Sequence, residues 1–149
     1  MGQVVIVPRR AKDWPERLAA HLAEGSKKLS VWGENDCAMD AANWVLRCLG
    51  VDFAAEYRGT YGDEEGAARR LSEVDGGSLM SAARRALGRP RRSVFEAGRG
   101  DLALVDIGGG QLSLGIVDTS GRRVAVVARP PLVGYARFPL SAAKAVWEV

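Results

Sequence analysis

The period of the apolar pattern changes near residue 100, and this change constrains the fold more than any other feature. Before that point, apolar residues recur at helical spacing, as at Trp14, Leu18 and Leu22. Beyond it, short apolar segments rich in branched residues are separated by glycine-containing turns, a pattern typical of antiparallel strands at 102–107, 112–117 and 124–128. Helices followed by strands predict an α+β fold with a small antiparallel meander, rather than an alternating parallel sheet.

Four helices are expected in the first part. The second is the best defined, because Asn35 or Asp36 can cap its start and Gly50 can end it after Leu49. The first should follow an N-cap at Asp13 and end near Glu24, before Gly25. The third should run over 63–74, and the fourth from a cap at 76–78 to about Gly88.

Three further elements are expected near the two ends of the chain. Val4–Val7 predicts a short opening strand, and Gly134–Phe138 predicts a strand beyond Pro130-Pro131. Ser141 is expected to cap a short C-terminal helix that ends at Trp147.

Composition places the chain among globular proteins. Its 149 residues fit one domain, and 47% are hydrophobic and 26% charged. We expect no membrane span, because no apolar run approaches roughly 20 residues. We expect no signal peptide either, because the Val4–Val7 stretch is too short for its apolar region.

Charge gives weak information about partners. The formal net charge is +3, and the one dense basic patch contains Arg84, Arg85, Arg89, Arg91 and Arg92. A solvated helix end and loop explains this patch, whereas DNA binding, the alternative, would rest on charge alone. We therefore expect no nucleic-acid partner.

The two cysteines, Cys37 and Cys48, are expected to share one helix. Eleven residues make about three helical turns, so the thiols should lie on one face but too far apart for a disulfide. One histidine and two cysteines cannot assemble a zinc site by themselves. We expect neither a metal nor another cofactor.

Cys37 is the main candidate for chemistry because it falls in the first turn of the second helix. Helix N-termini carry partial positive charge and unpaired N–H groups, which favour the nucleophilic thiolate. The alternative is a small buried residue at a helix start, since cysteine is commonly buried. The flanking Asp36 and Asp40 would raise the pKa of the thiol and oppose its activation.

The order of segments resembles the NlpC-type, papain-like cysteine peptidases over roughly residues 30–128. An Asp-Cys pair at 36–37 begins a helix, Gly-Asp at 100–101 opens a strand, and Ser-Leu-Gly-Ile-Val follows at 113–117. This resemblance implies a papain-like fold over one domain spanning residues 1–149, with Cys37 at the nucleophile position.

The whole chain is similar to an uncharacterised branch associated with the tails of phages and gene-transfer agents. The shared features are a Trp-x-x-x-Asp-Cys helix start, a Tyr-Arg-Gly-x-Tyr connector, Gly-Asp-Leu-Ala-Leu-Val, Leu-Gly-Ile and Ala-Trp-x-Val. In this sequence they correspond to 32–37, 57–61, 100–105, 114–116 and 147–149, with Ala145 nearby.

The chain departs from the peptidase pattern at two of the three catalytic positions. The resemblance places the histidine at Ser113, whose hydroxyl is not a base near neutral pH. The residue that would orient the histidine falls on 124–128, where every side chain is apolar. His21, the single histidine, is the remaining candidate base, but a partly buried or surface role beside an apolar helical face is the simpler interpretation.

Two functions follow from the resemblance. The first is a structural or interaction component of a phage tail tip or hub, assembled in the host cytoplasm and bound to other tail proteins. Its expected docking surface includes Phe53, Tyr57, Tyr61 and Tyr135, the last in the loop that begins at Pro130, although ordinary packing over the sheet explains them as well. The alternative is a cysteine peptidase or amidase that acts on peptidoglycan stem peptides during phage entry, with Cys37 as nucleophile.

Overall fold

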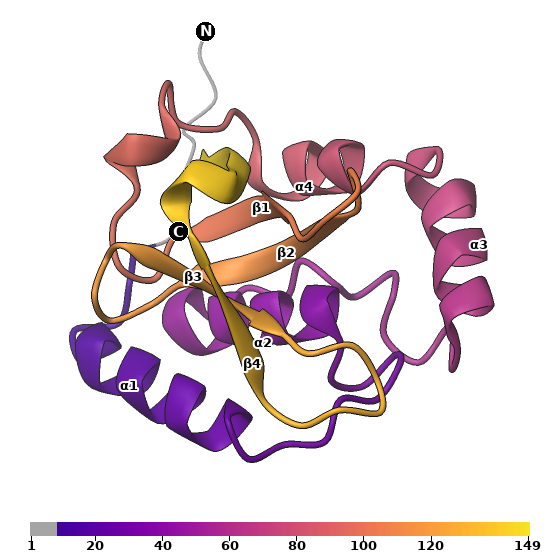
Figure 1. Cartoon of the computed structure of the whole chain (residues 1–149), viewed down its shortest axis with the longest axis horizontal. Helices are drawn as coiled ribbons and strands as arrows, with labels where there is room; N and C mark the ends of the chain where they lie inside the picture. The colour runs from indigo at the N-terminus through magenta and orange to yellow at the C-terminus, as the bar shows by residue number, and fades with distance from the viewer. Residues whose placement is uncertain (1–8) are drawn as a thin grey trace, which may run out of the picture.

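The described part of the chain, residues 9–149 of a computed structural model, is α+β, with four helices followed by a five-stranded antiparallel sheet (Figure 1). The predicted fold class is confirmed at this level. The expected strand at Val4–Val7 lies outside the described residues.

The four predicted helices are present. Three begin with a side chain that accepts a hydrogen bond from a backbone N–H of the first turn, as the sequence predicts: Asp36 from Met39, Asp63 from Gly66 and Ser78 from Ser81. The helices are α1, Trp14–Gly25; α2, Cys37–Leu49; α3, Glu64–Asp75; and α4, Leu79–Leu87.

The ends of α1 differ from the prediction. Asp13 occupies the N-cap position, but its carboxylate accepts from the Arg17 guanidinium instead of a backbone N–H. Gly25 is the last helical residue rather than the residue beyond the helix. A side chain at Gly25 would meet the Tyr135 ring, so the glycine allows β4 to approach the end of α1.

The predicted meander forms most of the sheet, whose strand order is β4-β3-β2-β1-β5. A short 3₁₀ turn, Val94–Glu96, lies between α4 and the first strand. The strands are β1, Leu102–Asp106; β2, Leu112–Val117; β3, Arg123–Val127; β4, Tyr135–Pro139; and β5, Ala143–Trp147.

The predicted C-terminal helix is wrong. Residues 140–142 form one 3₁₀ turn, and Ala143–Trp147 is a strand that pairs antiparallel with β1. Without β5, the backbone N–H and C=O groups at the edge of β1 would lack hydrogen-bond partners. A strand supplies these partners, whereas a helix would not. Trp147 is then buried, with its indole N–H donating to the Gly88 carbonyl oxygen.

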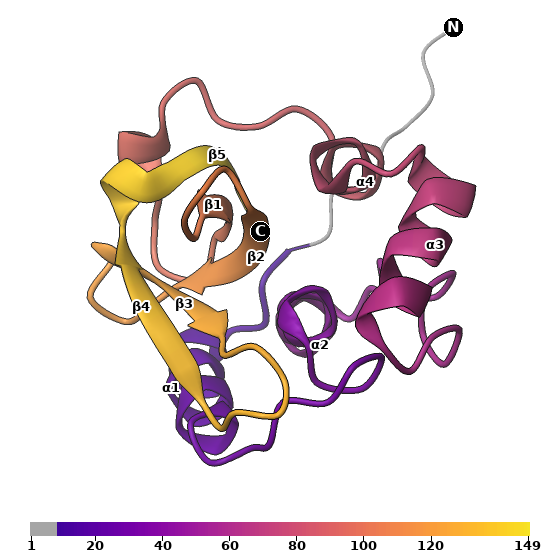
Figure 2. The same cartoon turned by 45° about the vertical axis from the view of Figure 1, so that its right-hand side comes forward.

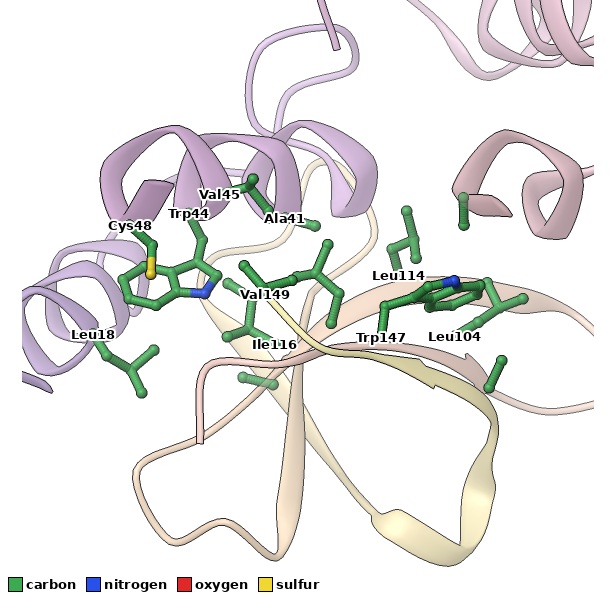
Figure 3. Close-up of a cluster of buried hydrophobic side chains, with 14 of the residues drawn as sticks. Leu18, Ala41, Trp44, Val45, Cys48, Leu104, Leu114, Ile116, Trp147 and Val149 are labelled. Atoms are coloured by element: carbon green, nitrogen blue, oxygen red, sulfur yellow. The ribbon is translucent and has the colours of Figure 1, made fainter. Parts of the chain in front are cut away.

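The main core lies between the sheet and the helices. Figure 3 shows Trp44 and Cys48 extending from α2 toward Leu18 of α1, while Trp147 lies beside Leu104 and Leu114 of the sheet. The Trp44 indole N–H donates to the Gly100 carbonyl oxygen at 2.7 Å, which ties α2 to the turn before β1.

Helices α3 and α4 lie on the opposite side of α2 from α1 (Figure 2). They contribute little to the core: every residue of α3 stays partly exposed, and Ala83 is the buried residue of α4. Their apolar side chains instead line the cleft described below.

Candidate functional site

The start of α2 is held by Asp36, the residue immediately before Cys37. One carboxylate oxygen accepts from the Met39 N–H at 2.9 Å, and the other accepts from the Gly33 N–H at 2.8 Å and from the Tyr61 hydroxyl at 2.6 Å. Gly33 has a positive φ, and a side chain there would collide with the Tyr61 carbonyl oxygen. These contacts fix the position of the Cys37 thiol.

The Cys37 thiol lies in surroundings that keep it protonated. Burial raises its pKa most, and the neighbouring Asp36 carboxylate raises it further. Hydrogen bonds from the Leu114 and Ala38 amides and from the Ser113 hydroxyl act in the opposite direction without reversing the increase. The position at a helix start therefore does not produce an activated thiolate here.

Ser113, where the resemblance places a histidine, lies against Cys37. Both residues line the same two hollows of the surface, and β1–β2 pairing places Ser113 opposite Val105. Cys37 and Ser113 are 76 positions apart in the sequence, and the fold brings them together. They are the positions where the resemblance places the nucleophile and the histidine. The group facing the thiol is a hydroxyl, which supplies no base.

A cleft of about 320 Å³ opens beside Cys37, between α2, the α3–α4 pair and β2. We call it the α3–α4 cleft. Its walls are mostly alanine and leucine, and its polar lining residues include Gln111 and Ser113 beside Cys37 as well as Glu64 and Arg85. Its lining includes Trp32, Cys37, Ala82, Arg85, Ala86, Gln111 and Ser113.

A second hollow, of about 70 Å³, lies on the other side of the same residues. It shares Trp32, Asp36, Cys37, Gln111 and Ser113 with the α3–α4 cleft and extends to the segment at 127–130. Cys37 and Ser113 therefore lie where two hollows meet. Sequence reasoning missed Gln111, which belongs to no motif, and it used Trp32 only as part of the helix-start motif at 32–37 without predicting that it lines a pocket.

His21 is occupied elsewhere. It is buried, its Nε2 lies 3.0 Å from Oδ1 of Asp40, and its ring is tilted against Trp44 with the centroids 5.8 Å apart. The Tyr135 hydroxyl donates to the same Asp40 oxygen at 3.1 Å. His21 lines neither hollow that contains Cys37. The structure thus places His21 in a buried polar cluster and not beside the thiol.

The four aromatic residues expected at a docking surface are half-buried. Phe53 packs against the main core, and Tyr57 donates its hydroxyl to Asp75. Tyr61 and Tyr135 donate to Asp36 and Asp40, as described above. Burial is the first cause that raises the pKa of Tyr57 to about 12, and the Asp75 carboxylate adds to it. Each of the four therefore has a contact within the chain and also keeps a partly exposed side chain.

Asp101, which the resemblance places at the opening of a strand, immediately precedes β1 and accepts hydrogen bonds from several parts of the chain. Its fully buried carboxylate accepts from the Gly98 and Val149 amides and from the guanidinium groups of Arg10 and Arg91. Arg10 also donates to the carbonyl oxygen of Val149. The carboxylate therefore joins both ends of the described chain to the sheet, a structural function.

The arginine patch is partly neutralised. Arg85 pairs with Asp75 and Glu56, and Arg91 pairs with Asp101 and Glu148. Internal ion pairs reduce the positive potential that a nucleic-acid backbone would meet.

Residues 9–149 contain no group of three histidine, cysteine, aspartate or glutamate side chains arranged to hold a metal ion. Both cysteines, which lie in this range, are unbridged thiols. Over the same range, no helix has both the length and the apolar character needed to cross a membrane.

Comparison with known proteins gives one match. The model of a family described as a domain of unknown function (DUF6950) matches residues 9–149. No curated protein matches the chain. No solved structure matches it either.

Proposed function

This chain belongs to the family described as a domain of unknown function (DUF6950), and we propose that it is a papain-like domain of the NlpC type without hydrolytic activity. Its proposed role is that of an interaction component of a phage or phage-like tail tip. The observation that carries the proposal is the contact between Cys37 and Ser113. A cysteine at a helix start facing the second strand of a meander is the arrangement that the resemblance implies, yet the base is missing.

The electrostatics of this pair support a non-hydrolytic role. Because burial and Asp36 raise the pKa of Cys37, the thiol stays neutral near pH 7. A neutral thiol facing a serine hydroxyl has no group that can take its proton or protonate a leaving amine.

An exposed apolar patch supports the interaction role. Leu29, Leu132 and Val133 are 53%, 61% and 57% exposed. Backbone bonding holds them together: Leu29 and Val133 form an isolated bridge, and the Ser30 N–H donates to the Leu132 carbonyl oxygen at 2.8 Å. Exposed apolar side chains gathered in this way mark interaction surfaces.

Within the loop that begins at Pro130, we therefore propose Leu132 and Val133 as docking residues in preference to Tyr135. Lys27 and Lys28 are exposed beside Leu29, and within residues 9–149 neither forms an ion pair. A tail subunit with an apolar patch bordered by acidic side chains would complement this surface.

Particles purified from the host that encodes the chain provide the test. We expect mass spectrometry to detect the chain in particles that carry the wild-type gene. Leu132→Asp should abolish incorporation, whereas Phe95→Asp, at a residue 72% exposed elsewhere on the surface, should not. Absence of the wild-type chain from particles would overturn the tail proposal.

A second experiment tests the papain-like relationship directly. Ser113→His should place an imidazole beside Cys37, lower the pKa of the thiol and accelerate its alkylation near pH 7. Lys144→His, at an exposed position of β5, controls for the added histidine. If both variants alkylate like the wild type, Ser113 is not equivalent to the histidine of the peptidases.

One observation favours the alternative, a cysteine peptidase or amidase of peptidoglycan stem peptides. Cys37 lies where two hollows meet, with the Ala38 and Leu114 amides acting on its sulfur. A partner subunit would have to supply the base. Release of peptide fragments from peptidoglycan by the wild type, and not by Cys37→Ala, would establish this alternative in place of the non-hydrolytic role.

A further inference from the structure

The walls of the α3–α4 cleft are built for an aliphatic ligand. Alanine and leucine are the most frequent lining residues, among them Ala67 of α3, Ala82 and Ala86 of α4, Ala38 of α2 and Leu114 of β2. The aromatic residues Trp32, Phe53, Tyr57 and Tyr61 line the cleft as well. Alanine leaves open the space that leucine would fill in a closed core. The volume of about 320 Å³ falls at the lower end of the range for small-molecule pockets, roughly 300–1,000 Å³.

The charged groups at the rim of the cleft are already paired within the chain. Glu64 pairs with Arg129, and Arg85 pairs with Asp75 and Glu56. The Asp36 carboxylate accepts three hydrogen bonds from the protein. A charged ligand would therefore lose hydration without gaining an unpaired counter-charge.

Uncharged polar groups gather at one end of the cleft. Ser113 contributes a hydroxyl, Cys37 a neutral thiol and the exposed Gln111 a side-chain amide. These groups can both donate to and accept from a neutral oxygen. We propose that the α3–α4 cleft binds a single-chain aliphatic molecule with an uncharged polar end, its chain lying among the alanines and its oxygen near Cys37 and Ser113.

The lining of the cleft favours a small aliphatic ligand over an apolar segment of a partner protein. Among the described residues, the large hydrophobic side chains that are exposed are Leu29, Leu46, Phe95, Leu132 and Val133, and none of them lines the cleft. The apolar walls are recessed, so they can enclose a chain but present no raised apolar surface to a partner. The inference is independent of the tail proposal, because binding is measured on the isolated chain.

The first experiment compares ligands that share a ten-carbon chain and differ in their polar head group, which is neutral, negative or positive. N-phenyl-1-naphthylamine, an uncharged dye that fluoresces in apolar sites, is bound to the wild-type chain and displaced at pH 8 with 1-decanol, decanoate or decylammonium. We expect decanol to displace the dye at a concentration about tenfold or more below either ion, because the cleft offers no counter-charge. Decanol should also slow alkylation of Cys37.

A variant then locates the site. Ala86→Trp should fill the cleft and reduce dye binding at least about tenfold. Ala23→Trp, on the exposed face of α1, is the matched control and should bind like the wild type. Ala82→Leu replaces Ala86→Trp if circular dichroism shows that the latter does not fold.

Several results would overturn the inference. Failure of the wild type to bind the dye, equal displacement by decanol and decanoate, or unchanged binding in the folded filling variant would each do so. Displacement by an amphipathic apolar peptide but not by decanol would instead identify the cleft as a protein-docking groove.

Discussion

The Tyr61 hydroxyl donates a 2.6 Å hydrogen bond to Oδ2 of Asp36, so the connector after α2 is bonded to the residue that caps the start of α2. This bond and the two backbone N–H bonds keep the Asp36 carboxylate beside Cys37, where its charge disfavours the thiolate. The same residue that stabilises the helix therefore restrains the candidate nucleophile.

Replacement of Asp36 by asparagine should make Cys37 easier to ionise. Burial continues to raise the pKa of the thiol, but the repulsion from Asp36 disappears, so the pKa falls and the pH profile of alkylation shifts to lower pH. Asparagine remains a good N-cap, so the stability loss should stay near 1 kcal/mol. Site-resolved alkylation with iodoacetamide against pH measures the shift.

Asp63→Asn is the matched control, since Asp63 caps α3 in the same way without affecting the pKa of Cys37. An Asp36→Asn profile that coincides with the wild-type profile would show that the carboxylate does not restrain the thiol. Cys48 is a buried reference, because burial raises its pKa as well.

Loss of the Asp101 carboxylate should destabilise the protein strongly. Asp101→Ala removes the acceptor of four hydrogen bonds, two from the guanidinium groups of Arg10 and Arg91 and two from backbone amides, at a cost of about 3–5 kcal/mol. Urea denaturation measures the free energy of unfolding. Asp13→Ala, which removes an exposed ion pair with Arg17, should cost less than about 1 kcal/mol. Similar losses in the two variants would contradict the structural role of Asp101.

Removal of His21 should affect stability without affecting the candidate site. His21→Ala leaves Asp40 buried with one side-chain partner, Tyr135, and should cost about 1–3 kcal/mol in the free energy of unfolding. Cys37 should be alkylated at the wild-type rate, because His21 contacts Asp40 and lines neither hollow. A large decrease in that rate, in a folded variant, would instead identify His21 as the base.

A methyl group at Gly115 should disrupt the pairing of β2 with β3. A Cβ there would lie 2.6 Å from a Val124 methyl carbon and 2.7 Å from the Ala125 carbonyl oxygen. Gly115→Ala should therefore destabilise the protein by about 1–3 kcal/mol, measured by thermal or urea unfolding. Gly62→Ala has open space around the new methyl group and should change stability little. A neutral Gly115→Ala would mean that the sheet can relax at this position.

Local signals in the sequence were sufficient to predict most secondary structure. Asp36 and Gly50 delimit α2 because capping depends on a few neighbouring residues. The meander followed from apolar runs and glycine turns. The last strand was wrongly predicted as a helix, because the five residues Ala143–Trp147 are too few to show a clear helical or strand period of apolar residues. Their conformation depends on pairing with the edge of β1, which is distant in the sequence.

The candidate site could be predicted in part. Helix capping placed Cys37 in the first turn of α2, and the resemblance drew attention to Ser113. The α3–α4 cleft could not be predicted, because its walls come from segments far apart in the sequence whose alanines look like ordinary helix formers. The partners of Tyr61 and Tyr135 also depend on tertiary contacts, so these tyrosines appeared available for docking.

Arg10 and Val149 bind each other and the same carboxylate, that of Asp101. A polypeptide that enters this domain at Arg10 therefore leaves it beside its point of entry. Such a domain can be inserted into a loop of another protein, or joined to neighbours on both sides, without spreading the two attachment points apart. One carboxylate, that of Asp101, would then hold both attachment points to the sheet.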